Sequence, residues 1–152
     1  MNTGGGGSPS RGELTDNGPG RGTVTSAEPA STTDGAARVV AAIRRAAVRL
    51  RFTTEAHLQR GLAQLFAEAG IPARREARLS RRDRPDFLVG TVAIEVKVSG
   101  TPAEVRRQLA RYLSYDTVTE VVLVTRCARH RELSGQLGGK PVYVVWVSGV
   151  IG

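Results

Sequence analysis

The sequence predicts an α/β fold in which a mixed central sheet is flanked by helices. Three segments place their apolar residues at helical spacing, and a fourth, weaker helical pattern lies nearer the C-terminus. Residues 120–125 and 141–147 are apolar runs typical of strands buried on both faces of a mixed or parallel sheet. The expected order of core elements is α, β, β, β, α, β, α, β.

Two helices are expected ahead of the sheet. The first covers about 36–50 and the second about 53–70. Thr53 and Thr54 offer hydroxyl oxygens that can cap the start of the second helix. Gly70 suits the left-handed position just beyond its end.

The sheet is expected to begin with a strand over 74–79, followed by a hairpin. Thr101, Pro102 and Glu104 then match a capping box with proline at the first helical position, which predicts a helix running to about residue 114. The weak helix is expected over 128–137, before the last strand.

Composition indicates one basic domain preceded by a tail. Of the 152 residues, 1–35 are rich in Gly, Ser, Thr and Pro, so we expect a disordered tail that cannot offset its ordering entropy by burial. Residues 36–152 are expected to form one domain. A net charge of +8 and a pI of about 10.9 favour polyanions, with nucleic acid as the leading partner. Each arginine cluster taken alone fits solubility equally well.

The expected location is cytoplasmic, without membrane association. No apolar run has the length of a secretory signal or a membrane span. The single cysteine, Cys127, rules out an internal disulfide and suggests a reducing compartment. His57 and His130 are isolated and match no zinc-site spacing, so both are expected to be structural or surface residues.

The most informative segment is the hairpin formed by 86–89 and 92–98. Gly90 and Thr91 suit a type II′ two-residue turn, which would place Asp86 opposite Glu95 on the sheet. The alternation of 92–98 puts Glu95 and Lys97 on one face. The chain has 20 Arg and only 2 Lys, so a lysine at this position indicates a need for a compact ammonium group.

Two carboxylates that close would repel each other, and a divalent cation bound between them would offset the repulsion. Mg²⁺ prefers oxygen ligands and is commonly held by one or two carboxylates, here Asp86 and Glu95. The carbonyl of Val96 is a candidate third ligand, and Glu55 lies at the start of an inward helical stripe. The alternatives are an ordinary cross-strand pair neutralised by Lys97, and a Glu55 that only complements the helix dipole.

Three motifs in order resemble the PD-(D/E)XK nuclease superfamily. They are Pro85-Asp86, Glu95-Val96-Lys97 with a helix directly after, and a Gln-x-x-x-Tyr pattern similar to that of RecB-like exonucleases at Gln108 and Tyr112. The resemblance covers most of residues 53–147. It implies a restriction-endonuclease-like αβββαβ core and a Mg²⁺- or Mn²⁺-dependent phosphodiesterase acting on DNA, in repair or restriction.

The resemblance also implies a role for each matching residue. Asp86 and Glu95 would be metal ligands, joined by Val96 and Glu55, and Lys97 would be the catalytic lysine. Substrate contacts would come from four residues: Gln108, Tyr112, Arg111 and Arg84. Related folds often pair to cut two strands, so a homodimer is possible. Two rival functions stay open: a non-catalytic nucleic-acid-binding subunit of a larger complex, and an adaptor for an acidic partner.

Overall fold

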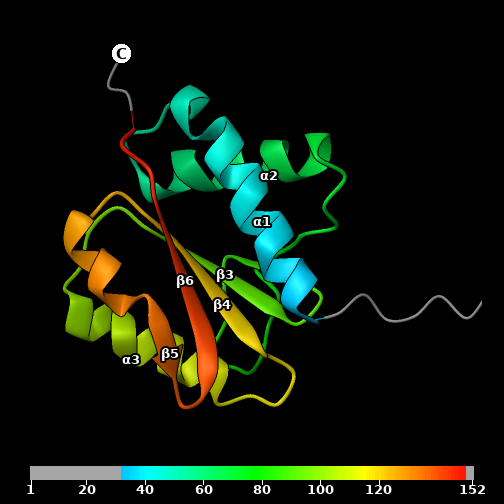
Figure 1. Ribbon diagram of the computed structural model, residues 1–152, viewed down its shortest axis with the longest axis vertical. Coiled ribbons are helices and arrows are strands. Elements are labelled where there is room, and N and C mark those ends of the chain that lie inside the picture. Colours follow the sequence, from blue (N-terminus) through cyan, green and yellow to red (C-terminus); the bar gives the residue numbers. More distant parts are fainter. Residues whose placement is uncertain (1–31, 150–152) are drawn as a thin grey trace, which may run out of the picture.

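The computed structural model describes residues 32–149 and places a six-stranded mixed sheet between helices (Figure 1). The helices are α1 (Thr32–Ala46), α2 (Glu55–Glu68) and α3 (Pro102–Leu113), with two 3₁₀ segments, η1 (Ala47–Arg49) and η2 (Ala128–Leu133). The strands are β1 (Arg74–Arg75), β2 (Phe87–Val89), β3 (Val92–Lys97), β4 (Glu120–Thr125), β5 (Gly135–Leu137) and β6 (Lys140–Trp146). The predicted α/β class is therefore confirmed.

The strand order across the sheet is β1-β2-β3-β4-β6-β5. Strands β3, β4 and β6 run parallel to one another, while β1, β2 and β5 pair antiparallel with their neighbours. The C-terminal ends of the three parallel strands therefore meet at one edge of the sheet. In open α/β sheets this is the edge at which ligands generally bind.

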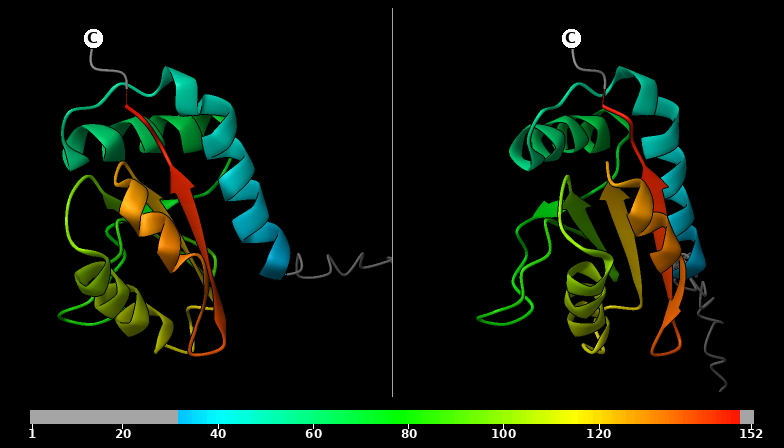
Figure 2. Two further views of the ribbon diagram at one scale, coloured as in Figure 1. Left: turned by 60° about the vertical axis from the view of Figure 1, so that its left-hand side comes forward. Right: turned by 90° about the vertical axis from the view of Figure 1, so that its left-hand side faces the viewer.

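Helices cover both faces of the sheet. Helices α1 and α2 lie on one face, and α3 with η2 lies on the other (Figure 2). Along β3, Val92, Ile94 and Val96 belong to the apolar cluster shared with α1 and α2, whereas Ala93 belongs to the cluster shared with α3. The alternation predicted for this strand is confirmed, and both of its faces are buried.

The hairpin has the predicted register, with Val89 opposite Val92 and Phe87 opposite Ile94. Gly90 has φ +57°, and Thr91 is not among the residues with positive φ, as a type II′ turn requires. The capping box of α3 is also present: the Thr101 hydroxyl accepts from the Glu104 N–H, and the Glu104 carboxylate accepts from the Thr101 N–H. Both features arise from residues at most three apart.

Helix α1 begins and ends earlier than predicted. It starts at Thr32 instead of Ala36 and gives way after Ala46 to a 3₁₀ turn. Residues 32–35 thus belong to a helix and not to the expected tail. The remainder of that expected tail, 1–31, lies outside the described residues, as does 150–152.

Two other elements differ from the prediction. The strand expected over 74–79 stops after Arg75, because Glu76 has φ +48° and turns the chain out of the sheet. The helix expected over 128–137 is a 3₁₀ segment followed by β5, which pairs with β6 across a Gly138-Gly139 turn. Both glycines have positive φ, so this turn favours a hairpin over a continuing helix.

Lys140 holds the end of α3 against the sheet. Its ammonium donates hydrogen bonds to the carbonyl oxygens of Leu113, Tyr115 and Val118, at 2.9, 3.1 and 2.7 Å. These three bonds satisfy acceptors at and just beyond the C-terminus of the helix, where a cation is electrostatically favoured. Among residues 32–149, no helix has both the length and the apolarity needed to cross a bilayer.

Candidate functional site

Charged and polar side chains from three elements, together with the residue before β2, meet at the C-terminal end of β3. Strand β3 contributes Glu95 and Lys97, and Asp86 immediately precedes β2. Helix α3 contributes Gln108 and Tyr112, and the first residue of α2 is Glu55. Residues that are far apart in the sequence thus meet where the start of α2 and the α3-facing side of β3 come together.

Glu95 is a buried carboxylate with three donors around it. Its side chain is packed between the sheet and α3, and the residue is 4% exposed. Lys97 Nζ lies 3.1 Å from Oε1, the Gln108 amide donates to Oε1 at 2.7 Å, and the Tyr112 hydroxyl donates to Oε2 at 3.0 Å. Burial raises the pKa of Glu95, while the Lys97 charge opposes that rise.

The Gln108–Tyr112 pair acts as one unit. The two residues are one helical turn apart, and the Gln108 amide also donates to the Tyr112 hydroxyl at 2.9 Å. The predicted pairing on one face of the helix is present. In the structure both side chains contact Glu95, so they fix the rotamer of that carboxylate.

Asp86 lies just outside the ladder of the hairpin, and its side chain takes the place of a backbone acceptor. Its Oδ2 accepts from the Val96 N–H at 2.8 Å, and its Oδ1 accepts from the Gln59 amide at 2.8 Å. Burial and then the nearby Glu95 charge raise the pKa of Asp86 to about 7. Because Asp86 binds the N–H of the residue that follows Glu95, the two acidic residues are neighbours on the hairpin.

The carbonyl of Val96 faces the same edge as Asp86. In a strand the N–H and C=O of one residue point to the same side, and the Val96 N–H points at the Asp86 carboxylate. The neighbouring Lys97 carbonyl points the other way, toward β4, where it accepts from the Arg126 N–H. The oxygen of Val96 is therefore aimed toward the Asp86 side of the strand.

Lys97 lies between two acids. Its ammonium is 3.1 Å from Glu95 Oε1 and 3.9 Å from Glu55 Oε1. A hollow of about 220 Å³ opens beside these groups and is lined by Glu55, Lys97, Ser99, Gly100, Glu104, Val105 and Gln108. The ammonium is thus held in place by carboxylates but remains open to a ligand.

The oxygen donors at this site fit a hard divalent cation. Asp86, Glu95 and the Val96 carbonyl supply oxygen ligands, and Mg²⁺ needs only one or two carboxylates because it keeps several waters. The pKa values of the partly buried Asp86 and the buried Glu95 are both raised, and a cation would stabilise the charged form of each carboxylate. Within residues 32–149, no three His, Cys, Asp or Glu side chains cluster tightly enough to form a metal cage on their own. Glu55 contacts Lys97, so its role as a ligand stays a prediction.

Arg111 and Arg84 have partners of their own. Arg111 Nε donates to Asp83 Oδ1 at 3.0 Å, and Tyr115 donates to the other Asp83 oxygen at 2.8 Å. Arg84 pairs loosely with Glu76, at 4.0 Å. Their expected contact with substrate stays a prediction.

Gln59 also belongs to the site, although the sequence alone did not predict it. Gln59 binds Asp86 from α2, and it follows Glu55 by one helical turn, so it shares the side of the helix on which Glu55 lies. That spacing is the signal that could have identified it. The partner of Gln59 is 27 residues away, which no local pattern reveals.

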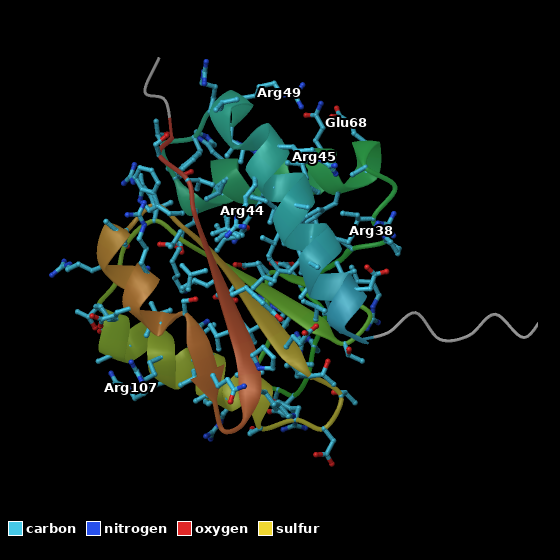
Figure 3. All side chains as sticks on the ribbon, in the orientation of Figure 1. Arg38, Arg44, Arg45, Arg49, Glu68 and Arg107 are labelled. Atoms are coloured by element: carbon cyan, nitrogen blue, oxygen red, sulfur yellow. The ribbon has the colours of Figure 1, made fainter. Side chains whose placement is uncertain are left out.

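A second hollow, of about 580 Å³, lies between α1 and α2. Its rim carries Arg45, Arg49 and Arg51 with Glu68, above a floor of Ala42, Ala46, Leu50 and Leu65. Figure 3 shows Arg45, Arg49 and Glu68 gathered where the two helices meet, while Arg107 projects from α3 in another part of the molecule. The second hollow is lined by one carboxylate and has no pair of acids that could bind a cation. We therefore regard the smaller hollow as the functional site.

Comparison of the chain with protein-family models, with curated proteins and with solved structures found no match.

Proposed function

We propose that the protein is a metal-dependent nuclease that hydrolyses DNA, built on a restriction-endonuclease-like core. One observation carries the proposal: the partly buried carboxylate of Asp86 and the buried carboxylate of Glu95 come from the two arms of one hairpin, and the ammonium of Lys97 lies 3.1 Å from Glu95 at the end of a central strand. The order of elements from α2 to β4, one helix followed by three strands, a helix and a strand, is the order that the resemblance implies.

The charges at the site support phosphodiester hydrolysis. A bound Mg²⁺ or Mn²⁺ would be held by Asp86, Glu95 and the Val96 carbonyl, and it would supply positive charge at the phosphate and a more acidic water. Tyr112 and Gln108 orient Glu95 for that task by binding both of its oxygens. Such preorganised charge lowers a barrier because no reorganisation is needed at the moment of reaction.

Lys97 is the group best placed to meet the substrate. Ion pairs with Glu95 and Glu55 limit its motion, and its side chain, which is 22% exposed, lines the smaller hollow. From this position the ammonium can donate to a non-bridging phosphate oxygen or hold the attacking water. The surrounding arginines would raise the local concentration of the polyanion.

The test is cleavage of labelled DNA by purified protein with Mg²⁺, with Mn²⁺ or with EDTA. We expect cleavage with either cation and none in EDTA. The Glu95→Gln and Lys97→Met variants should each lose about 100-fold or more in cleavage rate, because the first removes a charge that would hold the cation and the second removes the ammonium that would contact the phosphate. The panel should include linear duplex, single-stranded and branched DNA and RNA.

Glu120→Gln is the matched control for Glu95→Gln. Glu120 is also 4% exposed and also has a pKa raised by burial, but it is in register with Val92, which faces the α1 side of the sheet. The Glu120→Gln variant should cleave DNA at the wild-type rate. Cleavage by Glu95→Gln at the wild-type rate would reject the assignment.

A second candidate function is a non-catalytic nucleic-acid-binding module. The observation that favours it is that Lys97, Gln108 and Tyr112 already satisfy Glu95 within the chain, without a cation. This function predicts salt-dependent DNA binding with no cleavage. It also predicts that Mg²⁺ leaves the thermal midpoint unchanged, whereas a ligand that binds only the folded state must raise it.

A further inference from the structure

Trp146 ends β6 at the same edge of the sheet as Lys97. The register aligns Lys97 with Thr125 on β4, and Thr125 with Trp146 on β6. Two strand spacings of about 4.8 Å separate their Cα atoms by about 10 Å. Residues aligned across parallel strands project to the same face, so both side chains belong to the face that α3 and η2 cover.

One residue connects the two side chains through its backbone. The Arg126 N–H donates to the carbonyl of Lys97 at 3.1 Å, and the Arg126 carbonyl accepts from the indole Nε1–H of Trp146 at 3.0 Å. The indole is therefore held in a defined position relative to the candidate catalytic lysine. A tryptophan whose N–H is already satisfied presents mainly its ring faces to a ligand.

The ring is exposed although it belongs to a large apolar side chain. Trp146 is 40% exposed, and among residues 32–149 only Val48 is another exposed large apolar residue. The neighbours of Trp146 along the strand, Val145 and Val147, are buried. Burial in the core therefore does not account for the tryptophan at this position.

One guanidinium group lies over the exposed ring. The guanidinium of Arg131 lies over it, 4.6 Å from the ring centroid, and comes from η2, which packs beside β6 (Figure 2). Arg126 and Arg129 precede it in the same short segment, in which Glu132 is the nearest acid. An aromatic ring with a basic side chain beside it is a combination by which proteins hold single strands: bases stack on the ring and phosphates pair with the cationic group.

We propose that Trp146 and Arg131 form a stacking platform for an unpaired base of the substrate, about 10 Å from the phosphodiester that Lys97 contacts. The inference rests on the proposed function and specifies its substrate as single-stranded DNA, or a single-stranded end. At a rise of about 3.4 Å per stacked nucleotide, the platform lies about three nucleotides from the reacting phosphate. Bases within a closed duplex have both faces covered by their neighbours and do not reach the ring.

Fluorescence can test the platform because Trp146 is the only tryptophan of the chain. Lys97→Met protein in EDTA would be titrated with a single-stranded oligonucleotide and, separately, with a duplex closed by hairpins at both ends. We expect saturable quenching by the single strand and little by the closed duplex. Equal quenching by both, or none by the single strand, would overturn the proposal.

Variants supply a second, independent measurement. The affinity for a labelled single strand would be measured by fluorescence anisotropy in EDTA. Relative to the unsubstituted protein, Trp146→Ala should bind about 10-fold more weakly, and Trp146→Phe should retain most of the affinity. The affinity of Arg131→Gln should lie between those of the two Trp146 variants. Val48→Ser alters the other exposed large apolar residue and should bind the single strand with the same affinity as the unsubstituted protein. If Trp146→Ala folds poorly by circular dichroism, Trp146→Phe and Arg131→Gln still decide the outcome, since a purely structural tryptophan predicts unchanged affinity in Arg131→Gln.

The two proposals fail in different ways. Cleavage by the wild type without quenching in the Lys97→Met protein would remove the platform and leave the nuclease. Quenching without any cleavage by the wild type would reject the proposed nuclease function and support a single-strand-binding site.

Discussion

Replacing Asp86 by asparagine should stabilise the protein above neutral pH in the absence of divalent cations. The folded-state pKa of Asp86 is about 7, against an ordinary value of 3.8, because burial and Glu95 disfavour its charge. Between these two values the folded state binds more protons than the unfolded state, so stability falls as pH rises through this window. Asparagine carries no charge and removes this loss.

The pKa difference sets the size of the effect. A difference of about 3 between the folded and unfolded states corresponds to a ceiling of about 4 kcal/mol, at about 1.36 kcal/mol per pKa unit. Asp86 is only partly buried, so solvent screening reduces the expected gain to about 2 kcal/mol at pH 8. Asparagine can still accept from Val96, and the Gln59 amide can turn to accept from asparagine, so no hydrogen bond need be lost.

The assay is urea unfolding of both proteins in EDTA, from about pH 4 to about pH 8. The variant should match the wild type near pH 4 and exceed it increasingly toward pH 8. Asp83→Asn is the opposite control: hydrogen bonds, first from Tyr115 and then from Arg111, hold the pKa of Asp83 below its usual range. Its carboxylate therefore stabilises the fold above about pH 4, and this variant should be less stable than the wild type at neutral pH. A stability difference between Asp86→Asn and wild type that does not change with pH would refute the reasoning.

Three further substitutions have defined outcomes. Lys140→Met should lower the free energy of unfolding by about 2–3 kcal/mol, measured in urea, because three carbonyls lose a charged donor; a loss below about 0.5 kcal/mol would contradict this. His130→Ala should cost about 2–4 kcal/mol in the same assay, since a buried ring within 2.8 Å of the Gly100 carbonyl is removed. Tyr112→Phe should shift the rising limb of the cleavage pH profile to higher pH, because the Tyr112 hydroxyl lowers the pKa of Glu95; an unchanged profile would contradict the view that cleavage requires ionised Glu95.

Features that arise from neighbours in the sequence could be predicted, and they were confirmed. The hairpin register follows from one glycine at the turn and the alternation of β3. The start of α3 follows from Thr101 and Glu104, three residues apart. In each case the interacting groups are so close along the chain that their residue types alone determine the local geometry.

Features that depend on distant contacts could not be predicted. The early end of β1 follows from the left-handed conformation of Glu76, whose N–H donates to the Asp86 carbonyl across the turn. Arg111 is held by Asp83, 28 residues away, so its charge could not be assigned to a structural role from the sequence. The nearness of Trp146 to Lys97 depends on the crossover connections that place β4 between β3 and β6.

The rarity of lysine has a practical consequence for chemical labelling. The only two ε-amino groups of the chain are those of Lys97 and Lys140. All three N–H donors of Lys140 are engaged by carbonyl oxygens, whereas Lys97 faces a hollow. An amine-directed reagent applied to the folded protein should therefore modify Lys97 ahead of Lys140. The degree of labelling at this one position then reports how far a phosphate or a metal ion shields the site, without the need for a substrate that turns over.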